Sequence, residues 1–492
     1  MTKKNWPGVI VGLMGLLLSC PAAEAQETPT QPAAPSGGTG ADQQNAAPGV
    51  TGVTGADQQN GAPNDVTTNL QQPQRPPTLQ PLPDEIPRGQ TVADRPHPDY
   101  QPAGLPIGSF IFYPDLTIGQ SFNNNILGTP THTLSDFITS VQPSMELRSN
   151  WNNNALNFHF DDSFQKYAEH PAQDYNDFTL SSDGRLDVDR DTQIFGGIGY
   201  SVRHEPVYSV NNPAVINPAF TTTVPEQYTD LAANAAIQHT FNRLTVRLDA
   251  NYDKFDFSNV TATDGTLIRM DLQNYDQETL TLKTSYELAP GRQVYVLGSY
   301  DWRNYEFPAD LTGVNRTSQG YTAAGGFTFD LTGITFLDVY AGYLRQNYIA
   351  PLRDAMGPTG GAKLTWNVTP LTTVTGTAAR GVAETILPGA SSYLVTTAQL
   401  KVDHELLRNL ILDGNIGYEM DNFQGVTRTD KLYSAGASAK YLINRHFSVN
   451  LAYTYLARTS TAATPLPGEF PIGGSGFNFN QSIVLLSFSA HL

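Results

Sequence analysis

The 492-residue sequence has a single cysteine, Cys20, which lies in an N-terminal stretch with the features of a secretory signal. If that stretch is cleaved, the mature chain has no thiol, which excludes disulfides and thiolate metal sites. The rest of the chain has no apolar run of about 18 residues, so a helical membrane protein is excluded. Basic residues are also few: 29 Lys and Arg stand against 46 Asp and Glu, a net charge of −17, which argues against nucleic acid as a partner.

Catalytic and cofactor motifs are missing as well. The sequence has no Gly-x-Ser-x-Gly elbow, no phosphate-binding glycine loop and no His-Glu-x-x-His stretch. His159 with Asp161, or Asp403 with His404, could form part of a hydrolytic site. However, 9 histidines spread over the chain give such neighbours by chance, and we expect these residues at a pore wall or rim. The sequence therefore predicts no enzymatic activity, no cofactor and no metal site.

The N-terminus predicts export from the cytoplasm. Lys3 and Lys4 precede an apolar run over residues 9–18, and Ala23-Glu24-Ala25 provides a small-x-small cleavage site. We predict a signal peptide over residues 1–25, with Gln26 as the first mature residue. Residues 17–20 also resemble a lipoprotein processing site, so lipid attachment at Cys20 is the alternative.

Residues 26–106 have no hydrophobic periodicity and are rich in Pro, Gly, Gln, Ala and Thr. Such a segment cannot bury enough apolar surface to offset its loss of conformational entropy. Residues 39–45 recur at 54–60, and residues 72–87 are especially proline-rich. We predict a disordered periplasmic linker. The alternative is a docking segment for periplasmic partners such as export components.

From residue 107 to residue 492 the sequence alternates between apolar and polar residues, as strands with two different faces do. Residues 244–253 are the clearest case, and residues 481–492 carry the pattern to the last position. An unprotected apolar strand promotes aggregation in a soluble protein, whereas a closed barrel pairs its last strand with its first. Short connections, such as 242–243 and 289–292, alternate with mostly longer ones, such as 209–224 and 258–271.

This alternation predicts an all-β fold: a transmembrane antiparallel up-and-down β-barrel of about 18 strands, within a range of about 16–18, in the bacterial outer membrane. An even strand number puts both termini in the periplasm, and outer-membrane lipid surrounds the wall. Whether a loop such as 209–224 folds into the lumen is left open by the sequence.

The alternation also predicts which charged residues line the pore. On the parity opposite to the apolar residues are Asp183, Arg185, Asp187, Arg247, Asp249, Asp253, Asp301, Arg303, Asp413 and Glu419. Acids outnumber bases here, so we expect a cation-preferring lumen. Asp162 has the lipid-facing parity of its apolar neighbours. A bulge that shifts the register, or a position above the bilayer, would explain it.

Residues 95–104 followed by 108–114 resemble the opening of a family of outer-membrane β-barrel porins, and residues 123–126 are similar to that family's turn after the first strand. Members often accompany exopolysaccharide or capsule biosynthesis genes in Gram-negative bacteria. The resemblance implies a pore for exopolysaccharide secretion, with polysaccharide as a partner, and it supplies no catalytic residues. A general diffusion porin for small solutes and a non-conducting envelope scaffold are the alternatives.

Overall fold

The computed structural model describes residues 91, 92, 95, 97–213, 222, 224–461 and 478–492. The predicted signal peptide and residues 26–90 of the predicted linker lie outside these ranges. Among the described residues, no helix is both long and apolar enough to cross a membrane.

One antiparallel sheet of 19 strands contains nearly all the regular structure. Its first strand, β1 (Leu105–Ile107), is short and pairs only with β2. The long strands are β2 (Phe110–Asn123), β3 (Asp136–Ser149), β4 (Ala155–Tyr167), β5 (Tyr175–Asp187), β6 (Thr192–Glu205), β7 (Glu226–Phe241), β8 (Leu244–Phe257), β11 (Tyr275–Ala289), β12 (Arg292–Tyr305), β13 (Ser318–Asp330), β14 (Thr335–Tyr348), β15 (Ala355–Thr369), β16 (Thr372–Glu384), β17 (Ser392–Leu407), β18 (Leu410–Gln424), β19 (Thr429–Leu442), β20 (Phe447–Ser460) and β21 (Phe479–His491).

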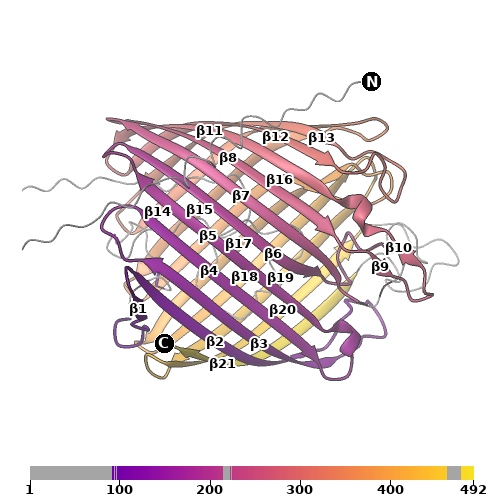
Figure 1. Cartoon of the computed structure of the whole chain (residues 1–492), viewed down its shortest axis with the longest axis horizontal. Coiled ribbons are helices and arrows are strands. Elements are labelled where there is room, and N and C mark those ends of the chain that lie inside the picture. Colours follow the sequence, from indigo (N-terminus) through magenta and orange to yellow (C-terminus); the bar gives the residue numbers. More distant parts are fainter. Residues whose placement is uncertain (1–90, 93–94, 96, 214–221, 223, 462–477) are drawn as a thin grey trace, which may run out of the picture. The chain divides into compact units, whose positions relative to one another are not determined.

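Each of these 18 strands pairs with its neighbours in the chain, and β21 closes the ring by pairing with β2 from Asp115–His491 to Asn123–Ile483. The predicted closed barrel of 18 antiparallel strands is therefore confirmed. In Figure 1 the front strands β2–β8 cross the strands behind them obliquely, as the tilted strands of a closed barrel do.

The alternating sequence dictates which side chains face outward. On β8, Leu248 is 44% exposed on the outer surface, whereas Asp253, on the other parity, is 7% exposed. Apolar side chains such as Leu280, Val296 and Leu486 occupy the outer face of other strands in the same way. Lipid covers such a face favourably, and the polar groups are left for the inner face.

The connections sort to the two ends of the barrel as predicted. Four connections at one end have only two residues: 242–243, 290–291, 370–371 and 408–409. Asn242 and Gly291 have positive φ angles of 56° and 75°, which such tight hairpins require. We call this end the short-turn rim. Connections 206–225, 258–274, 306–317 and 461–478 are at the other end, the loop rim, together with five others.

The loop that follows β8 has some regular structure of its own. Strands β9 (Val260–Thr261) and β10 (Leu267–Ile268) pair as a small ribbon, and the 3-10 helix η4 (Met270–Gln273) follows. Val260, Ile268 and Met270, which belong to these three elements, form a buried cluster. Figure 1 shows β9 and β10 at the opposite end from β1 and the C-terminus.

Asp162 lies on β4 without any bulge. Its pairing with Phe178 of β5 belongs to an unbroken register, so a register shift is not the explanation. On the other side the β3–β4 ladder is interrupted at Pro143, which has no N–H to donate. The Asp162 carboxylate accepts a hydrogen bond of 2.9 Å from the backbone N–H of Ser163. It therefore provides a side-chain acceptor for a backbone N–H group beside the break in the ladder.

Candidate functional site

The inner wall is lined by charged residues that are largely paired along their own strands. Residues two apart on a strand face the same side, and their side chains can meet. Arg247 and Asp249 are 2.8 Å apart, Arg185 and Asp187 3.1 Å, and Arg303 and Asp301 3.4 Å. All six are predicted pore-lining residues, and their bases and acids neutralise each other in pairs.

The other four predicted residues have different surroundings. Asp183 accepts hydrogen bonds from Asn157 and contacts His159 at 3.0 Å, and Asp413 lies 3.4 Å from the ammonium group of Lys401. Glu419 is within electrostatic reach of Arg458, and Asp253 is buried on β8. All ten side chains are on the face opposite to the exposed apolar residues; their role in lining a pore stays a prediction.

The most prominent feature of the lumen is a segment of the loop between β6 and β7, residues 206–213, which we call the inner-loop segment. Val210 is fully buried in a cluster with Ala383, Ala390, Tyr393 and Phe423. Around the ring, β6 is the fifth long strand and β17, which carries Tyr393, is the fourteenth. Nine strands is half of 18, so the segment reaches the opposite wall. The sequence left open whether this loop folds into the lumen.

Contacts with several parts of the barrel wall fix the inner-loop segment in place. The buried guanidinium of Arg458 on β20 donates a hydrogen bond of 2.7 Å to the carbonyl oxygen of Tyr208. The backbone N–H of Ile386 donates to Asn211 Oδ1 at 3.3 Å. The Tyr208 ring also packs against Phe479, with ring centroids 5.1 Å apart. These contacts keep the segment inside the barrel.

A second loop at the same rim is also held by an arginine. Arg316, in loop 306–317, is 1% exposed and ion-paired with Asp310. Its guanidinium donates to the carbonyl oxygen of Ala390 at 2.9 Å, in the loop between β16 and β17. Below it, Glu384 accepts hydrogen bonds from Arg303 and from the hydroxyl groups of Tyr305 and Tyr348. The loop rim is therefore a packed layer of loops.

At the short-turn rim, the chain that precedes β1 contacts β16 and β17, which are six and five strands away from β2 around the ring. Val92 is fully buried, and its N–H donates to Thr373 Oγ1 of β16 at 2.9 Å. Arg95 donates to the carbonyl oxygen of Pro370, and His97 lies 3.5 Å from Glu405. These described residues of the predicted linker thus pack onto the β16 and β17 wall.

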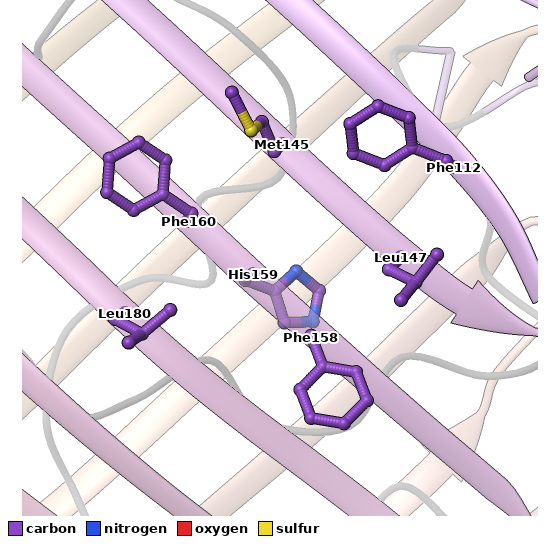
Figure 2. A pocket seen from close by; sticks show the side chains of 7 residues that line it. All are labelled: Phe112, Met145, Leu147, Phe158, His159, Phe160 and Leu180. Carbon is purple, nitrogen blue, oxygen red and sulfur yellow. The ribbon is translucent and has the colours of Figure 1, made fainter.

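A shallow depression occurs on the outer wall, across β2 to β5 (Figure 2). Its lining is almost entirely apolar: Phe112, Met145, Leu147, Phe158, His159, Phe160 and Leu180. The His159 ring makes its polar contacts with Asp183 and Glu146 of the inner face. The depression therefore belongs to the lipid-facing surface, not to a solute pathway.

The histidine-acid neighbours noted in the sequence do not converge on a common site. His159 hydrogen-bonds to Asp183, not to Asp161. His404 contacts Thr372 at 2.9 Å, while the adjacent Asp403 is ion-paired with Lys401. In the ranges that the structure describes, no three His, Cys, Asp or Glu side chains are arranged to hold a metal ion.

Sequence reasoning missed the carboxylates at the loop end of β6 and β7, namely Glu205, Glu226 and Asp230. Glu205 and Glu226 are direct cross-strand partners, and Asp230 is on the same inner face. Their alternation with Tyr228 was available in the sequence, in residues 226–230. The missing information was that Glu226 and Asp230 would be buried.

Comparison with known proteins agrees with this architecture. The family model described as "Putative beta-barrel porin 2" matches residues 97–465. Among curated proteins, none matches the chain.

Several solved barrels are similar in structure at low identity. OpdK of Pseudomonas aeruginosa, crystallised with vanillate, is 9% identical with a TM-score of 0.40, and the alignment covers 77% of this chain and 99% of OpdK. OpdO of the same organism is 13% identical with a TM-score of 0.41, covering 78% and 98%. The ferric enterobactin receptor PfeA of Pseudomonas aeruginosa is 8% identical with a TM-score of 0.43, covering 80% and 82%. Because the family model spans well over half of the 492 residues, this chain belongs to the Putative beta-barrel porin 2 family and is an outer-membrane porin-like β-barrel.

Proposed function

We propose that the chain is an outer-membrane pore for small hydrophilic solutes, narrowed at the loop rim by the inner-loop segment. Barrels of about 16–18 strands enclose more space than their wall side chains fill, and so leave an aqueous channel. The observation that carries the proposal is the contact of Val210 with Tyr393 and Phe423, half the ring away from the strands that the loop connects. A loop held there divides the lumen and limits the size of what passes.

The sequence resemblance over residues 95–104 and 108–114 supports a second candidate, secretion of an exopolysaccharide. In that case the proline-rich segment is the part that would meet periplasmic export components. A polymer of sugar rings needs a wider path than a small solute does, so this function requires the inner-loop segment to leave the far wall during transport. We therefore rank small-solute diffusion first.

Our proposal for the orientation rests on the termini. Both β2 and β21 have their terminal ends at the short-turn rim, where Asp115 pairs with His491. We propose that this rim faces the periplasm, because the linker and the C-terminus both leave from it. A single cysteine introduced at Asp264, between β9 and β10, should then react with a membrane-impermeant maleimide in intact cells. Reaction only after lysis would reverse the orientation.

Liposome swelling with sugars of increasing mass tests the pore. We expect monosaccharides and disaccharides to enter and long oligosaccharides to be excluded, with folding verified by heat-modifiable gel mobility. Passage of long oligosaccharides, together with loss of surface polysaccharide in a deletion strain, would favour the second candidate. No swelling with folded protein would favour the scaffold alternative.

A further inference from the structure

The inner face of β6, β7 and β8 carries four carboxylates near the loop rim. Glu205 and Glu226 are cross-strand partners, Asp230 is four residues along β7, and Asp253 lies one inward position further, opposite Ala232. Among the inward positions of 199–205, 226–232 and 253–257, Arg203 is the one basic residue. Acids therefore exceed bases in this part of the wall, unlike in the paired regions below it.

Two of these carboxylates are buried with an oxygen left unsatisfied. Glu226 is 5% exposed and Asp230 is 2% exposed. The Oε1 atom of Glu226 and the Oδ1 atom of Asp230 have no hydrogen-bond partner among the described residues. A buried carboxyl group is costly in its charged form, and the like-charged neighbours Glu205 and Asp253 raise that cost, which Arg203 lowers in part for Asp230. A bound positive charge would relieve it.

Aromatic rings surround the same carboxylates. Phe255 on β8 is the cross-strand partner of Asp230, and Tyr228 precedes Asp230 on the inner face of β7. The Tyr228 and Phe257 rings are 5.6 Å apart, and the Phe255 and Tyr275 rings 4.7 Å apart. The faces of such rings attract cations, and cages of them bind alkylated ammonium groups.

We propose that the cluster of Glu226, Asp230, Tyr228, Phe255 and Phe257 binds an organic cation, specifically a solute that carries an alkylated ammonium group. A metal ion fits less well, since in the described ranges no three acidic or imidazole side chains converge closely enough to ligate one. An alkylated ammonium ion needs no such convergence, because rings supply part of its environment. The site goes beyond the proposed pore function, because binding does not require conduction.

The test is calorimetric titration of the full chain in detergent with choline chloride, beside its neutral carbon isostere dimethylbutanol at the same ionic strength. Wild-type protein should bind choline saturably and not bind the alcohol. Asp230→Asn, which removes the charge and keeps the shape, should weaken choline binding by about tenfold. Because calorimetry does not depend on transport, a non-conducting protein would leave this result unaffected.

Asp338→Asn is the matched control. Asp338 is also an inner-wall acid beside a tyrosine, but both of its oxygens accept hydrogen bonds, from Tyr295 and Thr328 at 2.7 Å each. This variant should bind choline within twofold of wild type. Should Asp230→Asn fail to fold, Tyr228→Leu provides the same test from the aromatic side. Absence of choline binding, equal binding of the alcohol, or unchanged affinity in the site variants would overturn the proposal.

Discussion

Several bases of the inner wall lie two residues from an acid on the same strand, and this spacing reduces the charge that the lumen retains. Arg185 with Asp187 and Arg247 with Asp249 meet because alternate residues of a strand share a face. Such a pair contributes little net field. The field therefore comes from acids that have no such base, and Glu226 and Asp230 are the clearest of these.

Arg458→Ala should loosen the inner-loop segment. A hydrogen bond from a charged donor contributes about 2 kcal/mol, so its loss should shift the docking equilibrium by about 30-fold. We expect a larger single-channel conductance with more frequent fluctuations in planar bilayers. Asn211→Ala, which removes only the weaker contact with Ile386, should change conductance in the same direction but less.

Arg345→Ala is the control for the arginine change. Arg345 pairs with Asp354 at the loop rim, away from the inner-loop segment, and the pair is partly exposed. Its removal should leave conductance unchanged. If Arg458→Ala protein is folded by heat-modifiable mobility and conducts as wild type does, the segment does not limit the pore.

Tyr208 should make docking of the inner-loop segment sensitive to alkali. Burial raises the pKa of Tyr208 from about 10 to about 12. The docked state therefore holds the phenolic proton more tightly than the undocked state does. Docking stability is complete below pH of about 10 and is lost as the pH rises through about 12. Conductance should increase over this interval, and Tyr208→Phe should abolish the increase; an increase that persists in Tyr208→Phe would assign it to another group.

At the scale of elements, strands could be predicted and loops could not. A strand facing lipid on one side and polar groups on the other must alternate, as residues 244–253 do, so the period-two pattern is visible locally. The inner-loop segment depends on contacts such as Tyr208 with Arg458, which are 250 residues apart. No local pattern encodes such a contact. Asp162 shows the same limit, because the break in the ladder beside it comes from Pro143 on the neighbouring strand.

Deletion of β21 should abolish assembly, whereas deletion of residues 26–87 should not. β21 pairs with both β20 and β2, so its removal leaves two unpaired strand edges in contact with lipid. Residues 26–87 precede the first described contact of the chain with the barrel, at Val92. Heat-modifiable gel mobility of outer-membrane material is the measurement. Loss of heat-modifiable mobility on deletion of residues 26–87 would contradict this prediction. So would heat-modifiable mobility that persists without β21.

At the scale of the whole molecule, charge is unevenly distributed along the lumen. From residue 108 onward there are 37 acidic residues (46 minus 9) and 24 basic residues (29 minus 5), a net of −13. Charges on exposed loops are screened within about 8 Å at physiological ionic strength. Paired charges lower on the wall cancel. The remaining negative field is concentrated near the loop rim, where the inner-loop segment crosses the lumen.

We therefore expect a pore that prefers cations modestly, with a preference that fades at high salt. Glu226→Gln with Asp230→Asn removes two carboxyl groups beside the crossing segment. Asp187→Asn with Asp249→Asn removes two from ion pairs nearer the short-turn rim. At a pH high enough to ionise all four carboxyl groups the net change in charge is equal, so a uniform field would give equal shifts in reversal potential under a salt gradient. A low-dielectric wall focuses the field most where the lumen is narrow, so the first pair should shift the potential more. Equal shifts would place the selectivity along the whole wall, and anion preference in wild type would mean that the paired bases dominate the lumen.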